Sequence, residues 1–483
     1  MKHRILLLLP ALKEVLDRDF RQIKYSLFPP LSLLTLAALT PQDRYEVVVR
    51  DEHVEPVPIP GDFDLVAMTV YVSSAPRAYK LAERYREAGI KVIMGGIHPT
   101  TCPREALQHA DAICIGPGEA VWPQILNDYD TDRLRPVYRG KIEGTAQRMP
   151  VPRRDLMNPD AYLVRNTMVT SLGCPHSCDF CYKASFWGEH FYEHRPIEML
   201  ERELESMTGG FVFILDDNFL SCRQKARRIF PLLRHSGMVW QAAGSLDIAR
   251  DPEYLKEAYE AGCRSVFVGF ESLSRANMEA EGKNVNAFSD YAQAVKRFHD
   301  AGLMINGSFV FGFDGDGPDV FDRTLEFAIE NDIETGTFHI LTPYPGTPTF
   351  ARMQNAGRLL TTDWELYDTR HTVFRPAGMS PRELESGYHR AYREFYRYGS
   401  ILKRSLGQPG ALKRLAYNIG WKKSDWLWKH IIRLGLMSRI RPIFERILAR
   451  PTQPHTSSDE IQDQKSPASS GQFADEAAII SAG

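Results

Sequence analysis

Residues 167–182 read TMVTSLGCPHSCDFCY, and this stretch decides the fold of the central part of the chain. Its first five residues, Thr167–Ser171, are rich in β-branched and apolar side chains and predict a strand. The strand leads into a loop with the spacing Cys-x3-Cys-x2-Cys, formed by Cys174, Cys178 and Cys181. Three thiolates on one short loop can bind three irons of a 4Fe-4S cluster and leave the fourth iron open to another ligand.

Zinc is the main alternative for these thiols. A structural zinc site uses four ligands, and the nearby histidines are poorly spaced, because His176 lies inside the triplet and His190 lies beyond it. We therefore favour an iron-sulfur cluster. The remaining cysteines have no such company and are expected to pack as small apolar side chains: Cys102, Cys114, Cys222 and Cys263.

Strand-like runs separated by helical segments follow the cysteine loop. Together with Thr167–Ser171 they make six strands of one parallel sheet, and the chemistry of such units gathers at the carboxyl ends of the strands. The expected strands are Phe211–Leu215, Val239–Ala243, Ser265–Phe270, Ile305–Phe311 and Thr337–Leu341.

The N-terminal third has the rhythm of a doubly wound, Rossmann-like α/β sheet. Its opening, MKHRILLLLPAL, imitates a signal peptide but lacks a small-residue cleavage site, so we expect a buried strand there instead. The expected strands are Ile5–Leu9, Glu46–Arg50, Leu65–Thr69, Val92–Met94 and Ala112–Ile115. The expected helices are Leu31–Ala38, Ala75–Glu87, Arg104–His109 and Glu119–Asn127.

Glycines cluster where these strands should end. Gly95 and Gly96 follow one strand, and Gly116 and Gly118 with Glu119 follow the next. In a doubly wound sheet the ligand crevice lies outside the carboxyl ends of the strands, where glycine lets the backbone approach a bulky ligand. Ordinary turn chemistry is the equally simple alternative.

The cysteine motif, with Phe180 just before the last cysteine, resembles the signature of the radical S-adenosylmethionine superfamily. That resemblance implies a partial (β/α)6 barrel of the TIM type. It also implies that S-adenosylmethionine chelates the open iron and is cleaved reductively to a 5′-deoxyadenosyl radical. The runs GGIHPT, PREAL and ADAICIGPGEA resemble the cobalamin-binding module that precedes the barrel in one large class of these enzymes, the class B methylases.

The resemblance also implies roles for individual residues. Asp216 and Asp217 would contact the amino group of S-adenosylmethionine, although adjacent carboxylates could instead cap the next helix. Glu271 would contact the ribose or methionyl part, and a Pro-rich turn at residues 343–348 would lie against the adenine. The other cofactor-binding candidates are Phe180, Ser245, Gly95, Gly96, Gly116, Gly118 and Glu119.

Cobalt ligation by a histidine is not expected. Asp51-Glu52-His53 imitates the Asp-x-His-x-x-Gly loop of other cobalamin proteins, but it follows the second strand and has Pro56 where the glycine should be. We therefore interpret His53 as a loop histidine. Many members of the class bind cobalamin without such a ligand.

Five segments are expected along the chain. Residues 1–135 would form the cobalamin-binding domain, 136–165 a Pro-rich linker, 166–375 the barrel, 376–450 a basic helical region and 451–483 a disordered tail poor in apolar residues. The aromatic helical pattern of residues 383–405 is expected to pack as core, as a cap on the barrel mouth.

Composition and charge limit the class of protein. Hydrophobic residues make up 43% of the chain and the net charge is −2, which is typical of a globular enzyme. Clustered cysteines indicate reduced thiols and hence the cytoplasm. Basic helices bearing Trp421, Trp426 and Trp428 suit an anionic membrane surface or a solvated helix. Nucleic acid is not expected, because no recognition module accompanies the charge.

The order of the two modules predicts cobalamin-dependent methylation of an unactivated carbon of a small molecule, with a slight preference for a hydrophobic one. The cofactors would be a 4Fe-4S cluster, S-adenosylmethionine and cobalamin, and the reductant a flavodoxin or ferredoxin. Three alternatives stay open: oxidative ring closure or rearrangement by the same modules, an N-terminal domain that docks partners without cobalamin, and simple electron transfer.

Overall fold

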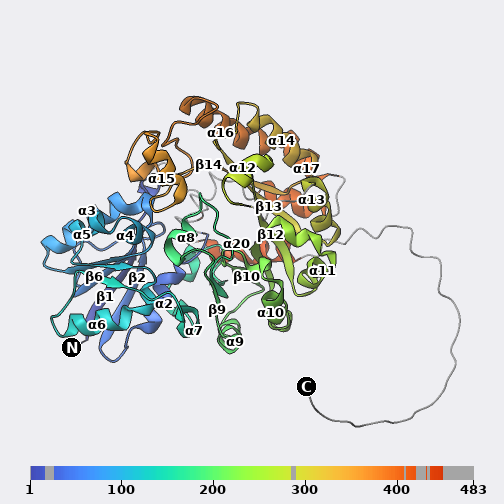
Figure 1. The fold of residues 1–483 in the computed structure, drawn as a ribbon. Helices are drawn as coiled ribbons and strands as arrows, with labels where there is room; N and C mark the ends of the chain where they lie inside the picture. Colours follow the sequence, from blue (N-terminus) through green and yellow to red (C-terminus); the bar gives the residue numbers. More distant parts are fainter. Residues whose placement is uncertain are drawn as a thin grey trace, which may run out of the picture.

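The computed structural model describes residues 2–16, 27–283, 290–406, 410–419, 431 and 436–449. Two six-stranded parallel sheets lie side by side, one from the N-terminal third and one from the centre of the chain (Figure 1). The tryptophans Trp421, Trp426 and Trp428 and the tail 451–483 lie outside the described residues.

The first sheet has the strand order β2-β1-β3-β4-β5-β6, and all its strands are parallel. The five predicted strands are confirmed. The sixth falls in the segment predicted to be a linker, where the buried Tyr138 and its pairing with Cys114 make it part of the sheet. The strands are β1 (His3–Leu9), β2 (Tyr45–Asp51), β3 (Leu65–Thr69), β4 (Lys91–Gly95), β5 (Ala112–Ile115) and β6 (Val137–Arg139).

Helices cover both faces of this sheet, because successive residues of each strand point to opposite sides. Ile5 and Leu7 of β1 share a core with the helices on one face, and Leu6 and Leu8 share a second core with those on the other. The predicted doubly wound fold is confirmed. The first face carries α2 (Leu31–Leu39) and α6 (Trp122–Asp130), and the second carries α3 (Ala75–Glu87) and α5 (Pro103–His109). The short helices α1 (Lys13–Leu16), α4 (Ile97–Thr101) and α7 (Thr145–Arg148) lie in connecting segments.

The second sheet has the order β14-β13-β12-β11-β10-β7 and is parallel throughout, which confirms a partial barrel of six strands. Its strands are β7 (Thr167–Met168), β10 (Phe211–Ile214), β11 (Val239–Gly244), β12 (Cys263–Glu271), β13 (Met304–Phe311) and β14 (Thr335–Ile340).

The strand predicted at Thr167–Ser171 is divided in two. Only β7 joins the barrel sheet, and Ser171 begins β8 (Ser171–Gly173), which pairs antiparallel with β9 (Tyr192–His194). The break occurs at Thr170, whose backbone N–H donates to Asp216 Oδ1 over 2.6 Å instead of to a neighbouring strand. The chain therefore turns out of the barrel just before the cysteine loop.

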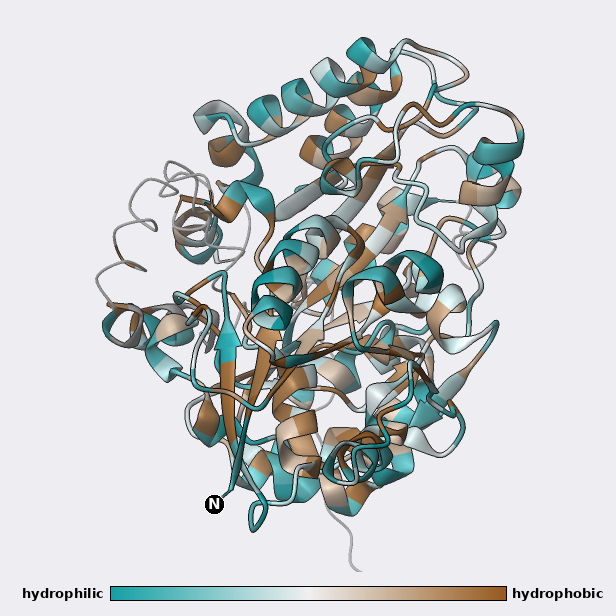
Figure 2. Ribbon diagram, turned by 90° about the vertical axis from the view of Figure 1, so that its left-hand side faces the viewer, coloured by the Kyte–Doolittle hydropathy of each residue, from teal (hydrophilic) through white to brown (hydrophobic). Residues whose placement is uncertain are grey.

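Helices surround the barrel, and the strands at the centre of each sheet are mostly hydrophobic while the helices around them alternate in hydropathy (Figure 2). This is the pattern of amphipathic helices packed on a buried parallel sheet. The helices are α8 (Tyr182–Trp187), α9 (Ile197–Glu205), α10 (Arg223–Ser236), α11 (Pro252–Glu260), α12 (Arg275–Ala280), α13 (Tyr291–Asp300), α14 (Val320–Glu330) and α15 (Pro348–Asn355).

The C-terminal helices reach both ends of the barrel: α16 (Pro381–Phe395) begins at the mouth, where a Cβ added at Gly312 would lie 2.8 Å from Leu384, and α17 (Tyr398–Ser405) lies at the opposite end. The buried Arg404 donates to the carbonyl oxygens of Ile333 and Glu334, both at 2.8 Å, and these residues precede β14 at the amino-terminal end of the barrel. A buried guanidinium needs such acceptors, and strand starts supply them. The helices are α16 (Pro381–Phe395), α17 (Tyr398–Ser405), α18 (Ala411–Asn418) and α20 (Met437–Ala449). Across the described ranges, no helix has the length and hydropathy needed to span a bilayer.

Candidate active site

The cysteine loop lies between β8 and α8 at the mouth of the barrel. The loop begins after Gly173, where φ is +80° and an added Cβ would lie 2.1 Å from the carbonyl oxygen of Phe191, so only glycine fits. Cys174, Cys178 and Cys181 are all half-buried and free of disulfides. The backbone N–H of Cys181 donates to the carbonyl oxygen of Cys178 over 3.0 Å, which fixes the tight turn between them.

The three thiols form one electrostatic group. Burial raises the pKa of Cys178 to about 12, Lys283 acts in the opposite direction, and the neighbouring Cys181 and Cys174 raise it further. Burial also raises the pKa of Cys174 and of Cys181. Coordination uses the thiolate, so a metal bound here would replace these protons.

The spacing of the thiols suits a cluster better than a single ion. Among the described residues, the group of three potential ligands whose atoms lie within 4.8 Å of one another is His98, Cys102 and Glu105, and the cysteine triplet is not such a group. One zinc ion, with sulfurs at about 2.3 Å, would need the thiols closer together. Three thiols set further apart than one ion requires are compatible with the larger iron-sulfur cluster.

Two carboxylates follow β10, and the structure separates their environments. Asp216 is buried and accepts hydrogen bonds from the Thr170 hydroxyl and the Ser171 hydroxyl, both at 2.5 Å. Asp217 instead forms an ion pair with Lys183 of α8. Asp216 thus holds the start of the cysteine segment against β10, while Asp217 faces the cysteine loop, where its charge raises the pKa of Cys174 and of Cys181.

Glu271 ends β12 in a left-handed conformation, with φ of +59°. Its carboxylate accepts a hydrogen bond of 2.6 Å from Lys283, and Lys283 also donates to the carbonyl oxygen of Gly269 over 2.9 Å. Lys283 lies near Cys178, whose pKa it lowers. Sequence reasoning missed Lys283, because this lysine follows a short helix and no spacing relates it to the strand ends.

The remaining candidates lie around the same mouth. Ser245 follows β11, and its hydroxyl oxygen lies 2.6 Å from that of Ser221. Phe180 packs edge-on against Phe313, with 5.8 Å between ring centroids. The Pro-rich turn after β14 contacts α8, because the Ser185 hydroxyl donates to the carbonyl oxygen of Gly346 over 2.7 Å.

A cavity of about 530 Å³ lies between the first sheet and the barrel. Every residue that the sequence assigned to cobalamin lines it, and so do Tyr182, Lys183, Phe186 and Trp187 of α8. The predicted lining residues are Gly95, Gly96, Gly116, Gly118 and Glu119. At Gly96, φ is +100° and an added Cβ would lie 2.9 Å from the carbonyl oxygen of Val70, so this wall is open only with glycine. A wide cradle of bare backbone fits a large planar cofactor such as a corrin.

His53 also lines the cavity, but both of its ring nitrogens contact the protein. Nδ1 lies 2.7 Å from Asp51 Oδ1, and Nε2 accepts from the backbone N–H of Leu12 over 3.3 Å. The hydroxyl of Tyr162 donates to the other oxygen of Asp51 over 3.0 Å. These contacts join the loops after β1 and β2, which agrees with a structural histidine.

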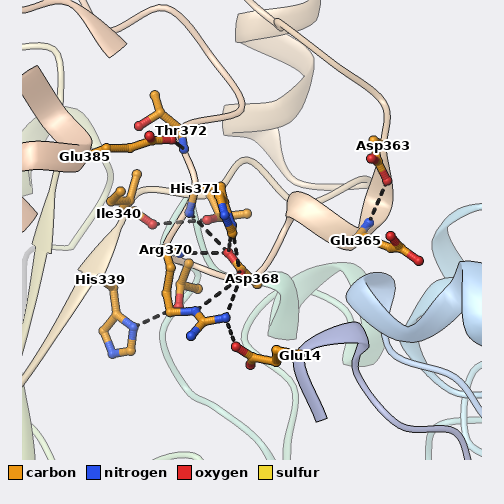
Figure 3. Close-up of polar contacts among 12 residues, drawn as sticks. Glu14, His339, Ile340, Asp363, Glu365, Asp368, Arg370, His371, Thr372 and Glu385 are labelled. Atoms are coloured by element: carbon orange, nitrogen blue, oxygen red, sulfur yellow. Dashed lines mark hydrogen bonds and ion pairs between the residues drawn. The ribbon is translucent and has the colours of Figure 1, made fainter. Parts of the chain in front are cut away.

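The segment that follows β14 connects the barrel to the N-terminal domain through ion pairs. Arg370 forms ion pairs with Asp368, at 3.1 Å, and with Glu14 of α1, and His371 Nδ1 lies 3.0 Å from Asp368 (Figure 3). Glu14 and Asp368 are mostly buried, with side chains 15% and 9% exposed. Screening by solvent is therefore weak, and the contact holds the two domains together.

A second contact between the domains involves the histidine of the GGIHPT run. His98 is fully buried, and its Nε2 lies 2.7 Å from the hydroxyl of Tyr79. That hydroxyl and Trp364 Nε1 both donate to Glu105, each over 3.0 Å. Burial lowers the pKa of His98 to about 4, against the raising effect of Glu105.

Three family descriptions match successive parts of the chain. The B12 binding domain matches residues 25–126, the Radical SAM superfamily matches residues 168–328, and a domain of unknown function (DUF4070) matches residues 347–458.

Proteins from Chlorobaculum tepidum are similar over most of their length. The bacteriochlorophyllide d C-12(1)-methyltransferase is 30% identical over 79% of this chain and 85% of its own. The bacteriochlorophyllide d C-8(2)-methyltransferase is 28% identical over 86% of this chain and 97% of its own. The solved structure of the cobalamin-dependent S-adenosylmethionine radical enzyme OxsB, with aqua-cobalamin and S-adenosylmethionine bound, shares the fold. Its TM-score is 0.63, at 14% identity, over 92% of this chain and 78% of OxsB.

Proposed function

The chain belongs to the radical S-adenosylmethionine enzymes that carry a cobalamin-binding domain and transfer methyl groups, and we propose that its substrate is a tetrapyrrole akin to a bacteriochlorophyllide. Its cofactors are a 4Fe-4S cluster, S-adenosylmethionine and cobalamin, and its substrate is a small molecule. The observation that supports the substrate class is the similarity to two bacteriochlorophyllide methyltransferases over most of their length.

We assign Cys174, Cys178 and Cys181 to the cluster. Lys283 would bind the carboxylate of S-adenosylmethionine, since its ammonium group lies beside the thiols and is already oriented by Glu271. Asp217 would bind the amino group of S-adenosylmethionine and Asp216 would act as a positioning residue. Ser245 and Phe180 would complete this side of the site. Bound together, the cluster and S-adenosylmethionine supply a carbon-centred radical, and cobalamin supplies the methyl group.

The glycine-rich cavity would hold cobalamin. Gly95, Gly96, Gly116 and Gly118 would let the corrin lie on the strand ends, and Glu119, whose pKa is raised by burial, would face the corrin rim. Helix α8 would separate cobalamin from the cluster. Lys183 of this helix lines the cavity and pairs with Asp217 on the side of the cysteine loop. The helix would therefore also fix the distance between the two cofactors.

We propose the following organisation for the whole chain. A cobalamin domain of residues 1–139 would be followed by a linker to 165, the barrel to 375, the basic helical region to 450, and a tail. The reductant would be a flavodoxin or ferredoxin of the cytoplasm, and the basic helices would bring the enzyme to the inner face of the membrane.

The test is an anaerobic assay of the reconstituted protein with dithionite, S-adenosylmethionine and a bacteriochlorophyllide. We expect a product heavier by one methylene unit, together with 5′-deoxyadenosine and S-adenosylhomocysteine. The matched control is a variant with Cys174, Cys178 and Cys181 all changed to Ala, which should form none of these three products. A cyclisation or rearrangement would instead consume S-adenosylmethionine to 5′-deoxyadenosine without S-adenosylhomocysteine.

A further inference from the structure

We infer that the amino-terminal end of the barrel docks on an anionic lipid surface through exposed leucines of its C-terminal helices. The basal face is defined here as Leu402 and Leu406 at α17, Leu412 of α18 and Ile443 of α20. This inference deepens the membrane contact proposed above and does not depend on the methyl transfer itself.

Exposed large apolar side chains concentrate on this part of the molecule. Among the described residues nine are exposed, and six of them lie between residues 398 and 443. Leu412 is 81% exposed, Leu406 58% and Ile443 57%. Scattered single leucines are ordinary on protein surfaces, but such a concentration on neighbouring helices marks a contact surface.

The apolar residues of α17 follow helical spacing on its outer side. Leu402 and Leu406 are four residues apart and both exposed. Ile401, just before Leu402, and Arg404, between the two leucines, are buried. The inner side is firmly held, because Arg404 also donates to the carbonyl oxygen of Phe395 over 2.9 Å and stacks 3.8 Å from the Phe395 ring. Leu402 is thus presented on a helix that is held to the barrel, and Leu406 directly follows the last residue of that helix.

Cations are exposed on the same helix and at the end of the preceding one. Lys403 is exposed on α17, and the side chains of Arg393 and Arg397 are 71% and 76% exposed. A single acid, Glu394, lies within 3.7 Å of both arginines. Apolar side chains among basic ones are the pattern of helices that lie in the interface of an anionic bilayer.

The basal face lies away from the chemistry. Arg414 of α18 pairs with Glu334 over 2.7 Å, just before β14, while the cysteine loop lies at the opposite, carboxyl ends of the strands. Helix α17 contacts α18, and α18 contacts α20, so the three helices share this end of the barrel. Docking here would anchor the enzyme and leave its mouth open to solvent.

A second copy of the chain is a poorer occupant for this face. In a twofold dimer the same patch meets itself, so the exposed Lys403 next to Leu402 would approach its own copy, and like charges repel. Anionic headgroups have the complementary charge. The charge pattern therefore favours lipid.

The experiment is flotation of the reconstituted full-length protein with vesicles of phosphatidylcholine alone or mixed with phosphatidylglycerol. The test variant is Leu402→Glu with Leu406→Glu. The matched control is Leu360→Glu, because Leu360 and Leu402 are both 43% exposed and Leu360 lies outside the basal face. Iron and cobalamin content and 5′-deoxyadenosine formation in detergent-free buffer are measured for all three proteins.

We expect the wild type and Leu360→Glu to float with the anionic vesicles only, and the double variant to bind them at least roughly tenfold less. Its cofactor content and 5′-deoxyadenosine formation should be unchanged, so that loss of docking is separated from loss of chemistry. Wild-type protein that ignores anionic vesicles overturns the inference. Equal flotation of the double variant and the wild type also overturns it. A third overturning result is a wild type that sediments as a dimer and binds no lipid, together with a double variant that sediments as a monomer.

Discussion

Lys183 of α8 forms an ion pair with Asp217, at the carboxyl end of β10, and the same lysine lines the cavity between the two domains. The pair thus links the glycine-rich cavity to the cysteine loop across α8, which we call the partition between the two sites. Burial lowers the pKa of Lys183, but Tyr182 and Asp217 raise it more, so the pKa lies above its usual range and the lysine stays charged.

Removing this cation should affect both cofactor sites. In Lys183→Met, Asp217 is left as a carboxylate only 15% exposed, which we expect to destabilise the protein by roughly 1–3 kcal/mol. Cobalamin retained through gel filtration should fall, and 5′-deoxyadenosine formation should slow. The matched control is Lys225→Met, at an exposed lysine of α10. Full cobalamin content and an unchanged rate in Lys183→Met would contradict the partition role.

Lys283 should be needed for S-adenosylmethionine and not for the cluster. In Lys283→Met we expect normal iron content but no change in the electron paramagnetic resonance spectrum of the reduced cluster when S-adenosylmethionine is added. Formation of 5′-deoxyadenosine should fall by roughly 100-fold or more, because the cofactor is no longer positioned. Lys296→Met, on the exposed side of α13, is the control. A wild-type spectral change in the variant would exclude the assigned contact.

Gly96 should be needed for cobalamin and not for the cluster. Gly96→Ala places a Cβ 2.9 Å from the carbonyl oxygen of Val70 in a left-handed backbone conformation, so the cavity wall must shift. We expect the variant to lose cobalamin while keeping its iron. Gly89→Ala is the matched control, since φ is +79° there but no atom lies within 4 Å of the added Cβ. Equal cobalamin binding by the two variants would contradict the assignment of the glycine-rich cavity to cobalamin.

His98 should make the fold sensitive to acid. Its pKa is about 4 in the folded protein because of burial, against an ordinary value of 6.5, so below about pH 6.5 the unfolded chain binds a proton that the folded chain does not. Stability is therefore full above pH 6.5 and is lost progressively as the pH falls toward 4. Urea unfolding should show roughly 2 kcal/mol of this loss by about pH 5.

His98→Gln should weaken that dependence on pH, whatever its effect at neutral pH. The control is His389→Gln, at an exposed histidine of α16, which should keep the wild-type slope. If wild type and His98→Gln lose the same free energy of unfolding between about pH 7.5 and about pH 5, another group is responsible.

The sequence by itself determined the elements whose signals are local. The Cys-x3-Cys-x2-Cys loop, the alternating strands and helices of both sheets, and the glycines at strand ends all follow from spacing within a few residues. For that reason Gly96, Gly116 and Glu119 could be assigned to one crevice before the cavity was seen. The break at Thr170 could not, because it depends on Asp216, which lies 46 residues further along the chain.

Only the tertiary structure decided which polar groups meet. Lys183 with Asp217, Lys283 with Glu271, and Glu14 with Arg370 join elements that are distant in sequence, and no local period encodes such pairs. The same holds for α17, whose helical pattern was evident but whose place at the amino-terminal end of the barrel depends on the buried Arg404 finding the carbonyl oxygens of Ile333 and Glu334. Local spacing fixes secondary structure and short motifs, whereas burial and charge pairing over long separations fix the site.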